Sequence, residues 1–186
     1  MILPIIAFGS PILRTKCSEV TQDFPDLDIL IENMRETMYE AHGVGLAAPQ
    51  INKAIRLFLI DTTPFVDDED ETEDVIVKQV FINARILEET GEGWSFNEGC
   101  LSIPDIREDI SRKPSITIEY FDDNFEKHTD TYDGLTARVI QHEYDHIDGI
   151  LFTDRISALR KRMIKGKLMD ISKGKVDVAY KMRFTR

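Results

Sequence analysis

Two histidines separated by three residues, with a glutamate directly after the first, lie in the segment QHEYDH (141–146). Residues four apart on a helix lie one turn above each other, so His142 and His146 can direct both imidazoles at a single metal ion. Glu143 lies about 100° round the helix from His142. It is therefore placed close to the ion without being a ligand, as a general base for water activated by the metal requires. The pattern also occurs by chance on surface helices, so a third ligand has to distinguish the possibilities.

The third ligand separates the classes of metal enzyme that use this pattern. In one protease class the motif continues to H-E-x-x-H-x-x-G-x-x-H, but Phe152 stands at the position of that third histidine. Another class takes a glutamate from a downstream helix, and this sequence has no glutamate after Glu143. An aspartate such as Asp170 stays open, and with it a zinc peptidase. The upstream candidates are His42, His128 and Cys100.

Cys100 lies in the segment NEGCLS (97–102), in which we find neither helical nor strand periodicity. A lone cysteine is most often a small buried hydrophobe, but nothing in this segment predicts core packing. Gly99 beside it lets the backbone come close to a ligand. This context favours a chemical role for Cys100 over a packing role.

Three segments, GVGLAAPQ (43–50), EGCLS (98–102) and QHEYDH (141–146), resemble the three signature motifs of the peptide deformylases, in that order and at compatible separations. The resemblance extends to most of the chain, including GSPILR (9–14) and the final helix. It implies hydrolysis of the N-formyl group from the initiator methionine of newly synthesised polypeptides, with release of formate. The acidic segment 67–74 looks like an insertion relative to shorter family members.

The resemblance also implies roles for single residues. Cys100, His142 and His146 would bind one divalent metal ion per chain, ferrous iron in vivo, with zinc, nickel or cobalt tolerated. Glu143 would accept a proton from the attacking water and pass one to the departing amine. The oxyanion would be held by the side-chain amide of Gln50 and the backbone N–H of Leu101. The positions implied in or near substrate binding are Val44, Gly45, Glu98, Gly99, Arg107, Leu135 and Val139.

Two alternatives differ from this reading in what they require of the residues. A zinc peptidase with an aspartate as third ligand would leave Cys100 dispensable for metal binding. A metal-binding regulator without hydrolytic activity would tolerate the loss of Glu143. Taken alone, GVGLAAPQ (43–50) is typical of a tight turn, and it lacks the third glycine and the Lys-Ser or Lys-Thr pair of a phosphate loop.

Length and composition limit what can surround these residues. A chain of 186 residues, 42% of them hydrophobic, can bury one core, whereas two complete domains would be unusual. The formal charge of −11 makes a DNA-binding surface unexpected. Two cysteines are too few for a disulfide scaffold and favour a reducing compartment, the cytoplasm. No stretch reaches the roughly 18 apolar residues that cross a bilayer, and the apolar start, broken by Pro4, predicts an extended segment rather than a signal peptide.

The histidine motif is expected on a helix that follows a hairpin. Apolar residues follow helical spacing over 135–149, with Asp133 or Gly134 near the N-cap. Before it, SITIEYF (115–121) alternates in the manner of a strand, and 125–132 can return as its partner.

The first half of the chain predicts a helix and strands. Helical spacing of apolar residues covers 26–42 and ends at Gly43. The short apolar run RLFLID (56–61) predicts a buried strand, with a possible partner at 75–83. Between them, seven carboxylates in eight positions predict a solvated loop over 67–74.

A last helix, predicted over 157–170, is basic in a chain that is acidic elsewhere. Such a face is most often simply solvated; the sharper hypothesis is docking near the ribosome exit, where RNA is anionic. The order of elements predicts an α+β fold with mostly antiparallel sheets around a central metal-binding helix, flanked by N-terminal and C-terminal helices. We expect one catalytic domain over 1–186 that acts as a monomer.

Overall fold

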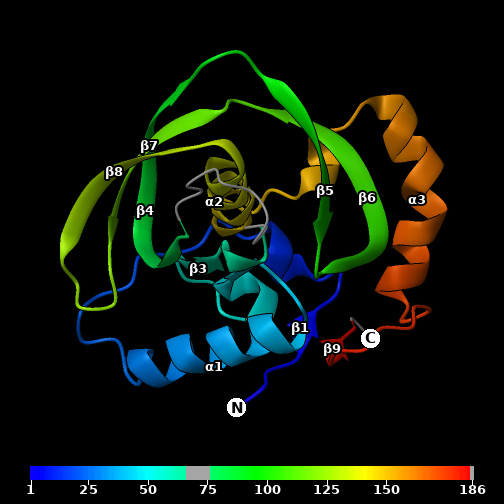
Figure 1. The fold of residues 1–186 in the computed structure, drawn as a ribbon. Helices are drawn as coiled ribbons and strands as arrows, with labels where there is room; N and C mark the ends of the chain where they lie inside the picture. Colours follow the sequence, from blue (N-terminus) through cyan, green and yellow to red (C-terminus); the bar gives the residue numbers. More distant parts are fainter. Residues whose placement is uncertain (66–75, 185–186) are drawn as a thin grey trace.

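The computed structural model describes residues 1–65 and 76–184 (Figure 1). The predicted acidic loop 67–74 lies outside these residues. The helices are α1 (Leu27–Glu40), α2 (Gly134–Ile147) and α3 (Ala158–Ser172). The strands are β1 (Ile5–Ile6), β2 (Gly45–Ala47), β3 (Leu57–Asp61), β4 (Lys78–Thr90), β5 (Trp94–Cys100), β6 (Ile103–Arg112), β7 (Ser115–Phe121), β8 (Lys127–Asp133) and β9 (Met182–Arg183). Short 3-10 helices cover Pro11–Arg14, Ala48–Ile51, Thr63–Phe65 and Phe152–Asp154.

The strands form an antiparallel sheet in the order β2-β3-β4-β7-β8, a β5-β6 hairpin and a small parallel pair, β1-β9. In Figure 1, α2 lies at the centre, with β4, β7 and β8 on one side and the β5-β6 hairpin on the other. α1 packs below the sheet, and α3 lies on the outside next to β6. The α+β prediction, with a central helix among antiparallel strands, is therefore confirmed.

β3 is buried on both of its faces, which explains its unbroken apolar run. Leu57 and Leu59 pack with the buried side of α1, including Met34. Phe58 and Ile60 point the other way, into a cluster that contains the apolar residues of α2. The second cluster holds α2 against the sheet, and the first holds α1 against the opposite face. The helix that carries the histidines therefore cannot shift without disturbing the core.

Most of the predicted elements are confirmed, with end shifts of the size at which assignment methods differ. The predicted strand 115–121 coincides with β7, and the predicted helices correspond to α1, α2 and α3. Asp133 is the N-cap residue of α2, and the Ser157 hydroxyl caps α3 by accepting a hydrogen bond from the Arg160 N–H. The strand expected at 75–83 is longer in the structure, because β4 continues to Thr90 through two irregularities in its pairing with β7.

The expectation that the segment around Cys100 has no strand periodicity is wrong. Trp94 to Cys100 form β5, in which Trp94, Phe96 and Glu98 are the more buried positions and Ser95 and Asn97 are exposed. The alternation is hidden in the sequence because the third inward position carries a charged residue, Glu98. No helix in the described part of the chain has the length and apolar character needed to cross a membrane.

Candidate metal centre

Three side chains that can bind a metal converge at the end of β5 and on one face of α2. One ligand atom from each of Cys100, His142 and His146 lies within 4.8 Å of the other two. The Cys100 Sγ is 3.2 Å from His146 Nε2. The helix supplies the two imidazoles one turn apart, and the hairpin end supplies the sulfur from 42 residues earlier in the chain.

The other candidates for a third ligand lie elsewhere. His128 is on β8, where its Nε2 is 2.8 Å from Asp122 Oδ2. His42 lines the groove beside the centre but does not join the group of ligands. Asp170 is on α3, 3.9 Å from Lys175 Nζ. Among residues 1–65 and 76–184, the thiol is therefore the third ligand that the geometry offers next to the two histidines.

The residues fit a divalent ion of the first transition series. A thiolate with two imidazoles suits zinc and iron, and three protein ligands leave a position open for water or substrate. Burial lowers the pKa of His146 far below its usual range, which keeps this imidazole neutral, as a ligand must be. Burial also opposes charge on His142, but hydrogen bonds to Cys100 and Glu98 raise the pKa of this imidazole to about 10. A metal ion bound here would therefore displace a proton from His142.

Glu98 orients His142. Its Oε2 is 2.9 Å from His142 Nδ1, which leaves Nε2 to face the ligand cluster. Burial alone would raise the pKa of Glu98, but the hydrogen bonds from His142 and Arg112 outweigh burial and hold it well below the usual range. Arg112 contacts both carboxylate oxygens, at 2.7 and 2.9 Å, and Arg138 adds a third contact at 3.0 Å. Glu98 is therefore a fixed anion behind the metal ligand.

The ion pairs continue from Glu98 to the far side of α2. Arg112 also donates to Asp145 Oδ2 at 2.7 Å, and Asp145 in turn binds Arg155 at 2.7 and 2.5 Å. Losing one partner of such a buried network leaves an uncompensated charge. The network thereby ties the helix of the two histidines to the hairpin of Cys100.

Arg138, one turn before His142 on α2, is a large cationic side chain that lines the groove. It is only 2% exposed, and it donates to the carbonyl oxygens of Ile110 and Trp94 at 2.8 and 2.7 Å. Its guanidinium lies 4.5 Å from the centre of the Trp94 ring. These contacts explain why a large cation is accommodated beside the groove.

Glu143 has the environment of a general base. It is buried, and burial raises its pKa to about 7. Its Oε2 and the Nδ1 of His146 are buried without a hydrogen-bond partner among the described residues. A carboxylate oxygen without a partner at a ligand cluster is expected where a water or substrate atom completes the contacts.

Gly45 leaves room for that carboxylate. A Cβ atom at this position would lie 2.5 Å from Glu143 Oε1 and 2.8 Å from its Cδ. Only a residue without a side chain permits this approach.

We expect Gly45→Ala to lower kcat by about 10- to 100-fold, because the added methyl group displaces the Glu143 carboxylate by a fraction of an ångström or more. Release of formate from formyl-Met-Ala-Ser, the reaction that the resemblance implies, measures the loss. Gly166→Ala is the matched control, since a Cβ at Gly166 on α3 comes within 4 Å of no described atom beyond its own stretch of the helix. An unchanged kcat in Gly45→Ala would show that the position of Glu143 does not limit the reaction.

The two oxyanion donors implied by the resemblance lie next to Cys100. Gln50 is buried, and its Oε1 accepts a hydrogen bond from the Ala47 N–H at 2.8 Å, which fixes the amide. Its Nε2 points at Cys100 Sγ, 3.5 Å away. The N–H of Leu101, the residue after Cys100, has no hydrogen-bond partner within the described ranges.

A groove of about 690 Å³ opens onto this centre. Of the predicted site residues, it is lined by Val44, Gly45, Gln50, Glu98, Gly99, Cys100, Leu101, Arg107, Val139, His142 and Glu143. Leu135, one turn before Val139 on α2, is not among the residues that line it. The groove also includes residues that we did not predict: aromatic side chains such as Phe96, the buried Arg138 and a segment near the C-terminus. No pattern of spacing in the sequence marks these positions.

Comparisons with known proteins agree with this geometry. The sequence model of the polypeptide deformylase family matches residues 2–162. The peptide deformylase of Christiangramia forsetii is 62% identical over 189 residues, covering 99% of this chain and 96% of the relative; that of Flavobacterium johnsoniae is 58% identical with the same coverage. Among solved structures, a peptide deformylase from Legionella pneumophila has a TM-score of 0.79 at 34% identity, covering 94% of this chain and 98% of its own. The peptide deformylase from Thermotoga maritima has a TM-score of 0.74 at 39% identity, covering 84% and 99%.

Proposed function

This chain belongs to the polypeptide deformylase family, and on that basis we propose which residues carry out its reaction. The chain is a metal-dependent hydrolase that removes the N-formyl group from nascent polypeptides and releases formate. The family model and the fold support treating residues 1–186 as one catalytic domain.

We assign the metal to Cys100, His142 and His146, whose ligand atoms lie within 4.8 Å of one another. When bound, the ion would supply a Lewis acid that polarises the formyl carbonyl and makes water a better nucleophile. We propose ferrous iron as the ion in the cell, and zinc, nickel and cobalt suit the same sulfur and nitrogen donors. Glu98 keeps the His142 ring in the required orientation.

Glu143 moves the protons of the reaction. It takes one from water as the oxygen attacks the formyl carbon, and it returns a proton to the departing nitrogen as the C–N bond breaks. A carboxylate with a pKa near the working pH can do both. This role is supported by its burial at the ligand cluster with Oε2 unpaired among the described residues.

Gln50 Nε2 and the Leu101 N–H hold the oxyanion that develops on the formyl oxygen. Both lie beside Cys100, so a carbonyl group at the ligand cluster can reach both donors. Removing one donor of this type costs roughly 3 kcal/mol in acyl-transfer enzymes.

The groove takes the peptide. Val44 and Gly45 would pair with an extended chain in the manner of an added strand. Gly99 and Arg107 lie on the other wall, where Arg107 donates from Nε to Asn97 Oδ1 at 2.9 Å. Val139 offers apolar surface for the methionine side chain, and Leu135, one turn before it on α2, would extend that surface. All these residues come from one chain, so a monomer is sufficient.

The observation that carries this assignment is the convergence of Cys100, His142 and His146 at one point. Two of these ligands, Cys100 and His142, line the groove together with Glu143. The assignment is tested with ferrous-loaded, anaerobically purified protein and formyl-Met-Ala-Ser, by measuring formate. We expect rapid release that a chelator abolishes and that added ferrous ion restores. No release by protein with bound metal would contradict it.

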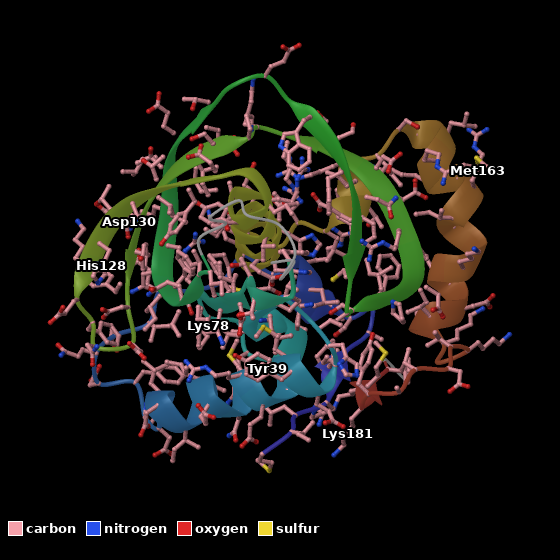
Figure 2. All side chains as sticks on the ribbon, viewed as in Figure 1. Tyr39, Lys78, His128, Asp130, Met163 and Lys181 are labelled. Carbon is pink, nitrogen blue, oxygen red and sulfur yellow. The ribbon has the colours of Figure 1, made fainter. Side chains whose placement is uncertain are left out.

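We further propose that the protein acts in the cytoplasm, where nascent chains appear, and that α3 docks on the ribosome. Arg162, Lys165 and Lys167 of this helix make no ion pair within the described residues, in a chain of net charge −11. Leu159 and Met163 on the same helix are 66% and 63% exposed, and Met163 points away from the body in Figure 2. A basic surface with apolar side chains suits an RNA-rich partner.

We expect the triple change of Arg162, Lys165 and Lys167 to Gln to weaken co-sedimentation with ribosomes several-fold at low salt, because fewer phosphate contacts form. Formate release from free peptide should not change. The control replaces Lys53, Lys78 and Lys127, which lie outside α3, by Gln. If both triple variants weakened co-sedimentation equally, ribosome binding would depend only on the total charge of the protein. That result would reject α3 as the docking surface.

A further inference from the structure

The chain beyond α3 returns to the body of the protein, past the end of the region matched by the family model at residue 162. β9 pairs in parallel with β1. Two hydrogen bonds secure this pairing, from Ile5 N to Lys181 O at 2.8 Å and from Ala7 N to Arg183 O at 2.9 Å. Figure 1 shows β9 beside β1, near the C-terminus. The segment before β9 is therefore held in a defined place.

That segment forms part of the groove. Asp177, Val178, Ala179 and Tyr180 line the same cavity as Cys100 and Glu143. Tyr180 is half-buried, and its ring packs against the cluster of α1 and β3 together with the side chain of Leu101. The C-terminal segment thus lines the groove at the metal ligands, although it belongs to none of the three sequence motifs.

The contact that matters is between Tyr180 and Leu101. The Tyr180 hydroxyl donates a hydrogen bond to the Leu101 carbonyl oxygen, at 2.8 Å. Leu101 and Ser102 form the two-residue turn between Cys100 and Ile103, which face each other across the hairpin.

The turn is held at further points. The Ser102 carbonyl accepts a hydrogen bond from the Phe8 N–H at 2.9 Å, and the Ser102 hydroxyl accepts one from Gln50 Nε2 at 3.2 Å. These two bonds hold Ser102, whereas the Tyr180 hydroxyl binds the backbone of Leu101. The carbonyl it binds and the N–H assigned to the oxyanion belong to neighbouring peptide planes that share the Leu101 Cα. Both ends of this two-residue turn are fixed by the pairing of Cys100 with Ile103, so holding the Leu101 carbonyl restricts the orientations open to the whole turn, including the Leu101 N–H.

We infer that Tyr180 is a positioning residue for the reaction: its hydroxyl fixes the turn so that the Leu101 N–H points at the developing oxyanion. This inference rests on the proposed role of Leu101. Without the hydroxyl, the turn samples more orientations and the donor is aligned for a smaller fraction of the time, so the transition state loses more than the bound substrate does.

The test is Tyr180→Phe, which keeps the ring and removes one hydrogen bond. We expect kcat for formyl-Met-Ala-Ser to fall roughly three- to tenfold, the range for one net hydrogen bond, while KM stays within about twofold and the metal content is unchanged. In zinc-loaded protein, hydrogen exchange at the Phe8 amide, which donates to the Ser102 carbonyl of the same turn, should become faster. Tyr39→Phe is the matched control, because the Tyr39 hydroxyl donates to Asp61 Oδ2 at 2.7 Å, outside the groove; its kcat should be that of the wild type.

An unchanged kcat in Tyr180→Phe, with a lowered melting temperature alone, would overturn the inference and leave Tyr180 as a structural tie for the C-terminal segment. Wild-type protein that binds metal but releases no formate would instead contradict the proposed function. The two failures are therefore distinct.

Discussion

Glu143→Ala is expected to lower kcat by about two to four orders of magnitude, the range attributed to general acid–base catalysis, and to leave the metal content unchanged. Its carboxylate is outside the ligand group of Cys100, His142 and His146, so the ion does not depend on it. Formate release under substrate saturation and metal analysis of the same sample measure the two halves of this prediction.

The stability of the same variant separates catalysis from folding. Glu143 is buried, and Oε2 has no hydrogen-bond partner in the part of the chain that the structure describes. Removing a buried polar group without a partner relieves a desolvation cost. We therefore expect the melting temperature of Glu143→Ala to equal or exceed that of the wild type, an example of a site that favours function over stability.

Glu119→Ala is the control for this experiment, because Glu119 lies on β7 and pairs with Lys127 at 2.8 Å, outside the groove. Its kcat should be that of the wild type. Near-normal turnover in Glu143→Ala would remove Glu143 from the mechanism and favour a metal-binding protein without hydrolytic chemistry.

The predicted and the observed fold differ where a charged residue occupies a buried position. The helices and β7 follow from the spacing of apolar residues, which is a local property of the sequence. β5 and β6 were missed because Glu98 and Arg112 point inward, and these polar residues break the alternation. Their burial is possible only because each meets an opposite charge, and that pairing depends on the three-dimensional structure.

The site, like the fold, divides into residues that local spacing predicts and residues whose roles depend on contacts between distant segments. His142, Glu143 and His146 lie within five consecutive residues of one helix, so their convergence can be derived from spacing. Cys100 is a ligand candidate that spacing cannot select over other residues; the family resemblance was needed to choose it. No spacing pattern in the sequence predicts the roles of Arg138 and Tyr180, because these roles come from contacts with distant segments.

Cys100→Ser is expected to weaken ferrous binding by more than the 10- to 100-fold that loss of an outer partner of a metal ligand typically causes. A serine hydroxyl at this position is a poor replacement, since it is not ionised near neutral pH as a metal-bound thiolate is. Formate release should fall in proportion to the fraction of protein that retains metal, and excess ferrous ion should restore part of it.

Cys17→Ser provides a close control. Cys17 is the other cysteine of the chain and is also unpaired, but it is buried where its N–H donates to the Ile147 carbonyl at 2.9 Å, and burial raises the pKa of its thiol to about 11. A thiol in that state packs as a small apolar group, so the serine variant should lose stability and keep its metal. If Cys100→Ser bound metal as tightly as Cys17→Ser, the thiolate would not be a ligand, and a carboxylate ligand of the peptidase type would be required. If only Cys100→Ser lost metal, the sulfur at the end of β5 would be established as the third ligand.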